Sequence, residues 1–165
     1  MIVEMTNHET QEKIQIEVEG INVEELKQQF KLNFSAAELR RIIDNLDIPA
    51  EAKVLLTELL NFSIKVGTVV LEVGKKIIEV VNVFAKSFPN ITAGMIIAVT
   101  LSFLISCVPV LGAFLGWLCT PLFLLIGVGV GVLKEIENTE LGKAMNDVMD
   151  AIFAGLKKIP VPAVP

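Results

Sequence analysis

A run of 47 residues, from Ser87 to Leu133, contains no aspartate, glutamate, lysine, arginine or histidine. In a chain of only 165 residues, few segments remain to cover so much apolar surface. The run holds two apolar segments, residues 92–108 and 113–133, joined by the connector PVLG. Both lengths fall within the range for a helix that spans the ~30 Å hydrocarbon core of a bilayer. The run therefore predicts a transmembrane helical hairpin over residues 89–133.

Prolines and glycines predict the internal features of this hairpin. Pro109 and Gly112 interrupt the apolar run and predict the turn, and Pro121 predicts a kink because proline has no N–H to donate. Small residues four positions apart let helix backbones approach closely in lipid. A further pair of glycines, seven residues apart, precedes the hairpin. The predicted helix-packing and oligomerisation positions are Gly67, Gly74, Gly112, Gly116, Gly127 and Gly131.

The charges on either side of the hairpin predict its orientation. Lys86 precedes the run and Lys134 follows it, while the connector between the two segments is uncharged. Because the cytosolic flanks of membrane helices are enriched in lysine and arginine, both termini are expected to be cytosolic. The predicted localisation is a membrane of the bacterial inner or plasma type, and the lipid bilayer is the predicted partner.

Residues 1–33 are expected to form a small acidic unit of strands and helix on the cytosolic side. Residues 13–20, KIQIEVEG, alternate apolar and polar side chains, which is the pattern of a half-buried strand. Residues 2–3 could pair with this strand across a turn near residues 6–10, and a capping pattern predicts a short helix over residues 22–30. Two strands alone are marginally stable. The unit is therefore expected to pack on neighbouring helices or on a second copy of itself.

Residues 34–88 are predicted to be amphipathic helices that lead to the membrane. Ser35 and Glu38 form a capping-box pattern before apolar residues at helical spacing. From Pro49 to Phe88 the pattern predicts one helix of up to forty residues, with a broad stripe of β-branched side chains. Such a stripe needs lipid, oligomeric or tertiary contacts. The alternative interpretation is a core-facing helix of a bundle.

Residues 134–165 are predicted to be a C-terminal amphipathic helix, over residues 138–158, and a proline-rich tail. The polar face of the helix mixes acidic and basic side chains. A helix that lies on an anionic membrane surface usually has a basic polar face. Packing against the segment before the hairpin is therefore favoured over an interfacial position.

Few residues suited to catalysis are present. His8 is the single histidine, and no metal-binding, phosphate-binding or nucleophile motif accompanies it. Cys107 and Cys119 lie inside the uncharged run, where reduced thiols behave as small hydrophobes. We therefore expect no enzymatic activity, no cofactor and no metal site.

Acidic side chains dominate the first third of the chain. Residues 1–60 carry 12 acidic and 6 basic side chains, and the whole chain has a formal net charge of −5. Nucleic-acid binding needs basic side chains to neutralise phosphates, so nucleic acid is not an expected partner. A cytosolic protein that contacts the acidic N-terminal unit is the expectation instead.

The order of these parts predicts a mainly α fold class, with a membrane hairpin, flanking amphipathic helices and a small N-terminal α+β unit. In outline, residues 35–158 are similar to the pore-forming domain of colicins, in which amphipathic helices sheath a hydrophobic hairpin, with no shared sequence motif. The favoured function is an integral membrane protein that forms a homo-oligomer through its hairpin, as a pore-forming or permeabilising assembly of effector, toxin-like or lysis type. One alternative is a non-conducting membrane anchor or scaffold that recruits a cytosolic partner. The other is a soluble helical bundle that buries the hairpin.

Overall fold

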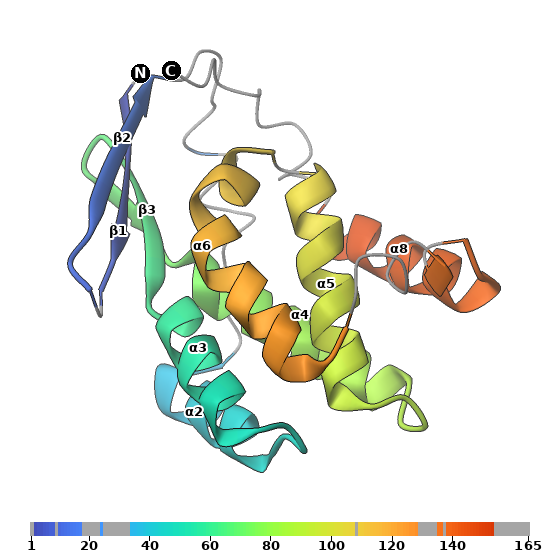
Figure 1. Ribbon diagram of the computed structural model, residues 1–165. Helices are drawn as coiled ribbons and strands as arrows, with labels where there is room; N and C mark the ends of the chain where they lie inside the picture. The colour runs from blue at the N-terminus through green and yellow to red at the C-terminus, as the bar shows by residue number, and fades with distance from the viewer. Residues whose placement is uncertain are drawn as a thin grey trace.

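A computed structural model describes residues 2–8, 10–17, 24, 34–107, 109–128, 135–136 and 138–153. These residues form an α+β fold, in which an antiparallel sheet lies at one side of a group of helices (Figure 1). The α+β character expected of the N-terminal unit is confirmed, and it involves more of the chain than expected. The elements are β1 (Ile2–Asn7), β2 (Lys13–Glu17), α2 (Ala36–Asn45), α3 (Ala50–Leu60), β3 (Phe62–Val66), β4 (Val69–Leu71), α4 (Val73–Ser87), α5 (Ala93–Cys107), α6 (Pro109–Ile126) and α8 (Glu140–Phe153).

The sheet has the strand order β2-β1-β3-β4, and each neighbouring pair is antiparallel. Met5 in β1 lies opposite Ile14 in β2 on one side and opposite Ile64 in β3 on the other. Because side chains alternate between the two faces of a strand, Val3 and Met5 are buried, whereas Glu4 lies on the opposite face. The predicted pairing of the first two strands is confirmed. The second neighbour of β1 is β3, which lies far along the chain and was not predicted as a strand.

The predicted continuous helix from Pro49 to Phe88 is wrong. The structure divides this segment into α3, the β3–β4 hairpin and α4. Gly67 lies in the two-residue turn between the strands with φ +61°, the positive value that tight hairpin turns require. The β-branched residues on either side lose rotamer freedom in a helix and pack well in a sheet. Pairing of β3 with β1 therefore favours strands over a helix in this segment.

The capping box at the start of α2 is confirmed. The Ser35 hydroxyl accepts a hydrogen bond from the Glu38 backbone N–H at 3.2 Å, and the Glu38 carboxylate accepts one from the Ser35 N–H at 2.7 Å. Leu39 and Ile43 on the inner face of α2 are fully buried. The amphipathic pattern read from this part of the sequence thus positions α2 against α3 and α4.

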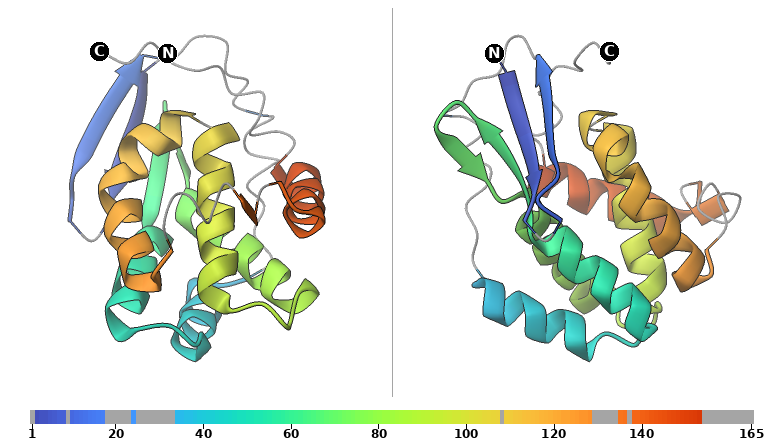
Figure 2. Two further views of the ribbon diagram at one scale, coloured as in Figure 1. Left: turned by 45° about the vertical axis from the view of Figure 1, so that its right-hand side comes forward. Right: turned by 60° about the vertical axis from the view of Figure 1, so that its left-hand side comes forward.

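Helices α5 and α6 form the predicted hairpin, but it packs inside the protein. The two helices lie side by side (Figure 2), with α5 also against α4 and α8, and α6 against α3. Both helices contribute to one continuous hydrophobic core with the sheet, α2, α3 and α4. The fully buried side chains of the hairpin include Ile96, Ile97, Leu101, Leu115, Leu118 and Leu122.

The prediction of a transmembrane hairpin is wrong. Within the described parts of the chain, no helix combines the length and the apolar composition that a membrane span requires. At 1.5 Å per residue, the 15 residues of α5 extend about 22 Å, which is short of the hydrocarbon core. Residues 129–133, the end of the predicted second span, lie outside the described residues. The predictions of a pore-forming function and of a membrane localisation depended on this hairpin, so they are wrong as well. The alternative in which a helical bundle buries the hairpin agrees with the packing of α5 and α6.

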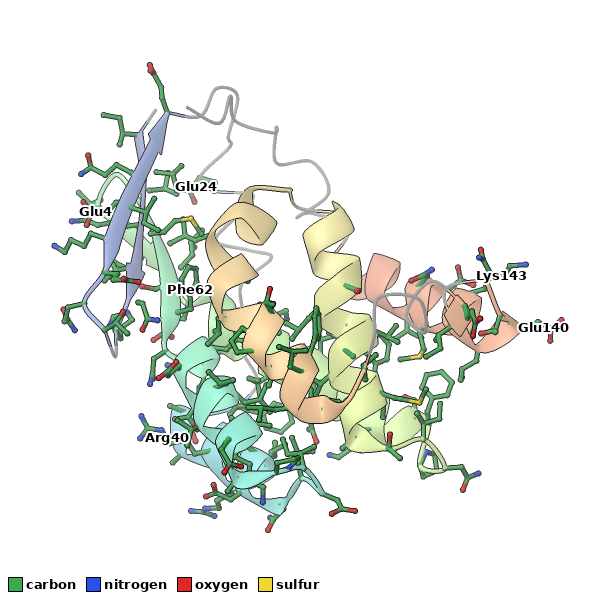
Figure 3. All side chains as sticks on the ribbon, viewed as in Figure 1. Glu4, Glu24, Arg40, Phe62, Glu140 and Lys143 are labelled. Atoms are coloured by element: carbon green, nitrogen blue, oxygen red, sulfur yellow. The ribbon has the colours of Figure 1, made fainter. Side chains whose placement is uncertain are left out.

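The C-terminal amphipathic helix is present as α8. Met145 is buried, while Glu140 and Lys143 are exposed (Figure 3). The helix packs against α4 and α5, in agreement with the favoured packing interpretation. The predicted continuation beyond residue 153 and the proline-rich tail lie outside the described residues, as does the predicted helix over residues 22–30, apart from Glu24.

Candidate functional site

The predicted glycine positions have different roles in the structure. Gly67 lies in a strand turn, not in a helix. Gly127 ends α6 with φ +78°, where its N–H donates to the carbonyl oxygens of Phe123 and Leu124, as a glycine cap does. A Cβ added at Gly116 would meet no described atom within 4 Å. Within the described part of the chain, none of these three glycines brings two helices into close contact.

Gly74 and Gly94 lie where backbones approach closely. Gly74, in the first turn of α4, faces the backbone carbonyl of Leu59 at the end of α3. Gly94, in the first turn of α5, faces Ile126 at the end of α6, whose Cγ2 would lie 2.6 Å from an added Cβ. Gly94 was not among the predicted positions. Its spacing of four residues from Ala98 is the small-xxx-small signal that could have identified it.

The structure also locates most of the residues that were predicted to form the turn and the kink of the hairpin. Pro109 begins α6, and Gly112 lies inside this helix, so the predicted turn over residues 109–112 is wrong. Proline suits a first helical position because its N–H is missing where none is needed. Pro121 lies inside α6 as expected. Gly131 and Lys134 lie outside the described residues.

Lys86 is not a free flanking charge. It lies in the last turn of α4, with its Nζ 6.0 Å from the centroid of the Phe34 ring. This is the geometry of a cation–π contact. Lys86 thus links the end of α4 to Phe34, which precedes the Ser35 cap of α2.

The sheet has two edge strands, β2 and β4, and the residues along the outer edge of β2 are exposed. The Asn7 N–H donates to the Glu12 carbonyl oxygen at 3.0 Å, so these two positions form a hydrogen-bonded pair. Such pairs alternate with non-hydrogen-bonded pairs in an antiparallel ladder. Positions 14 and 16 are therefore bonded to β1. The N–H and C=O groups that point away from the sheet belong to Lys13, Gln15 and Glu17.

The side chains of these three residues are exposed and lie on the polar face of the sheet. Glu4, from β1, projects from the face of the sheet that is turned away from the helices (Figure 3). Its carboxylate accepts a hydrogen bond from the Gln15 amide at 3.2 Å and lies 3.9 Å from the Lys13 Nζ. Lys13 nevertheless remains 64% exposed. Since exposed ion pairs contribute only about 0–1 kcal/mol, Lys13 remains available to a second carboxylate.

Hydrogen bonds hold the β1–β2 turn to the rest of the sheet. The His8 Nε2 lies 2.8 Å from the Ser63 Oγ, and the Ser63 hydroxyl donates to the Thr6 carbonyl at 3.3 Å. The Thr10 N–H donates to the Asn7 side-chain oxygen at 3.3 Å, within the turn itself. The edge strand is therefore presented by a turn that is fixed to β3.

The His8–Ser63 contact does not have the features of a nucleophilic pair. A serine nucleophile needs access to substrate and a base that accepts its proton. Ser63 is only 2% exposed, so a substrate cannot reach its hydroxyl. The contact is a structural one.

Helix α4 carries a pair of buried charges. The Lys76 Nζ lies 3.7 Å from the Glu79 Oε2, and the two side chains are 11% and 8% exposed. Because burial of an unpaired charge is costly, the two charges are expected to depend on each other. A more exposed pair at the same spacing joins Glu72, the N-cap residue of α4, to Lys75, with a 2.7 Å contact.

An apolar cavity of about 210 Å³ lies between α5 and α8. Sites for drug-sized ligands are usually 300–1,000 Å³ with a few convergent polar groups, so this cavity is small for such a ligand. Its apolar lining comes from Ile91, Met95, Val99, Ile136, Leu141 and Met145.

Cys119 is the thiol that the structure describes in detail. Desolvation by burial raises the pKa of Cys119 from 9.0 to about 12. The thiolate is the reactive form of cysteine, so the thiol stays protonated and unreactive at neutral pH. Across the described ranges, no group of three or more histidine, cysteine, aspartate or glutamate side chains is arranged to hold a metal ion.

Comparisons with protein-family models, curated proteins and solved structures found no match to this chain. The candidate site therefore rests on its geometry. Among the described residues, the outer edge of β2 combines exposed side chains of both charges with backbone groups directed outward.

Proposed function

We propose that the chain is a non-catalytic, self-associating interaction module that uses its N-terminal sheet as the contact surface. The single observation that carries this proposal is the exposed outer edge of β2. Strand edges of this kind add further strands through main-chain hydrogen bonds. Self-association was expected mainly through the hairpin, and a second copy was one of the two expected packing partners of the N-terminal unit. The packing of α5 and α6 within the core removes the route through the hairpin.

The chemistry of the described side chains supports a binding role over a catalytic one. Ser63 is buried, with its hydroxyl in contact with the Thr6 carbonyl and the His8 ring. The Cys119 thiol is protonated at neutral pH because its pKa is raised. Nucleophilic catalysis needs an exposed nucleophile with a base or a lowered pKa, and neither residue meets this requirement.

Self-association predicts a mass that depends on concentration. The expected result in buffer without detergent is a shift from the chain mass of 18.0 kDa toward twice that value as the protein is concentrated. A short strand edge makes a small contact, so we expect the midpoint in the range of about 1 μM to 1 mM that is typical of weak complexes. Sedimentation equilibrium measures this shift. A constant mass of one chain up to about 1 mM would contradict the proposed function.

A further inference from the structure

We infer that the strand added to β2 is β2 of a second copy, paired antiparallel about a twofold axis through Gln15. This inference rests on the proposed self-association and specifies its contact and register. The pairing would join two four-stranded sheets into one continuous antiparallel sheet. A symmetric dimer of this kind uses the same surface of both copies.

The backbone geometry of β2 fits this register. The outward N–H and C=O groups belong to alternate positions, because positions 14 and 16 bond to β1. With Gln15 opposite Gln15 of the second copy, position 13 lies opposite position 17 and position 17 opposite position 13. All three outward-facing positions then occupy hydrogen-bonded pairs. The dimer would satisfy both backbone groups at each of these positions.

The charges of β2 select the same register. Lys13 of each copy lies opposite Glu17 of the other, which makes two cross-strand ion pairs. Such opposite-charge pairs stabilise a sheet, whereas like charges directly opposite each other destabilise it. A register that centres on position 13 places lysine opposite lysine, and one that centres on position 17 places glutamate opposite glutamate. Parallel pairing in register brings like charges together as well.

Lys13 has two contrasting effects at this edge. Lysine on an edge strand usually discourages pairing with other chains. In β2 the sequence KIQIE places a glutamate four residues after the lysine. In the inferred register, Lys13 therefore gains a carboxylate of the second copy in addition to its exposed contact with Glu4. The edge therefore favours its own sequence over an unrelated strand.

The other face of the strand is compatible with this contact. Ile14 is half-buried and lies in the same row as the buried Met5. In the inferred register, position 14 lies opposite position 16 of the second copy, and both positions are isoleucine. Non-hydrogen-bonded pairs of this kind bring side chains close together. The sequence of β2 therefore places isoleucine positions opposite each other in the inferred register.

Charge reversal at the two ends of β2 tests the register. Glu17→Lys has lysine at both charged positions, and Lys13→Glu has glutamate at both. In sedimentation experiments, the dissociation constant of each variant alone is expected to rise at least about tenfold, because two ion pairs become repulsive contacts. A mixture of the two variants restores opposite charges across the contact. The mixture is expected to associate within about threefold of the wild type, as a heterodimer.

Two further variants act as controls. Lys65→Glu makes the same change of charge on the exposed face of β3 and is expected to leave association unchanged. Gln15→Pro removes an N–H that points away from β1, so it should abolish the dimer without loss of a β1–β2 hydrogen bond. Circular dichroism of each variant checks that the chain is folded, and association of the mixture confirms it independently.

The outcomes separate this inference from the proposed function. If the wild type associates and the single variants associate equally well, the register is wrong although self-association holds. The same conclusion follows if both variants fail to associate and their mixture stays monomeric. If the wild type itself is monomeric at every concentration, the proposed function fails and the inference fails with it. Loss in both single variants with recovery in the mixture is the result that supports the inferred dimer.

Discussion

Replacement of Gly74 by alanine is expected to destabilise the protein by about 3 kcal/mol, because a forced clash between backbones cannot relax by a change of rotamer. A Cβ at this position would overlap the Leu59 carbonyl oxygen and lie 2.6 Å from its carbonyl carbon and 2.9 Å from that of Leu60. Helices α3 and α4 would have to separate, although both contribute fully buried side chains to the core. Chemical denaturation of Gly74→Ala and wild type measures the difference in the free energy of unfolding.

Gly116→Ala is the matched control for this experiment. It makes the same chemical change inside α6, at a position where an added Cβ meets no described atom within 4 Å. Alanine is favoured over glycine within a helix by about 1 kcal/mol, so this variant should be slightly more stable than the wild type. Equal stability of the two variants would contradict the close approach of α3 and α4.

The second large effect on stability is expected from removal of the Glu79 carboxylate. Glu79→Ala is expected to lower the free energy of unfolding by about 3 kcal/mol, since it takes a buried partner from the buried ammonium of Lys76. The double variant Lys76→Met/Glu79→Leu replaces both charges with apolar side chains of similar size. It should recover most of the loss, because breaking a buried pair costs more than replacing it. Thermal and chemical unfolding of the three proteins measure these differences.

Glu72→Ala supplies the comparison at the start of the same helix. Glu72 is 47% exposed and pairs with Lys75 at the same i,i+3 spacing. Exposed pairs contribute about 0–1 kcal/mol, so this variant should change stability by less than about 1 kcal/mol. If Glu79→Ala changes stability as little as Glu72→Ala does, burial does not determine how much the Lys76–Glu79 pair contributes to stability.

Local patterns predicted several elements correctly. Alternation identified β2, the Ser35–Glu38 capping box identified the start of α2, and the amphipathic pattern identified α8. Each of these signals depends on neighbouring residues alone. Such signals survive because the tertiary structure agrees with them.

Long-range pairing accounts for the main error between residues 49 and 88. Ile64 and Val66 fit a helical apolar stripe and a buried strand equally well. Pairing of β3 with β1, whose partner positions lie more than fifty residues away, decides between the two structures. No local pattern carries information about that partner.

The uncharged run was misinterpreted because lipid and a protein core select the same residues. Absence of charge indicates a low-dielectric environment, and it does not identify which one. In the structure α3, α4 and α8 cover the inner faces of α5 and α6, while Leu124 stays 76% exposed near the end of α6. The N-terminal unit was expected to contact a partner, but the edge of β2 was not predicted as the contact, for a related reason. The residues of β2 were recognised as a strand, but its position at the end of the sheet follows only from the strand order.

Amide hydrogen exchange along β2 tests the inferred contact most directly. The N–H groups of Lys13, Gln15 and Glu17 point away from β1, whereas those of positions 14 and 16 are bonded to it. Exchange at the three outward positions should therefore slow as the protein concentration rises, while exchange at positions 14 and 16 stays slow throughout. This alternating, concentration-dependent protection is the result that the dimer predicts. Fast exchange at positions 13, 15 and 17 at every concentration would contradict the pairing of β2 with a second copy.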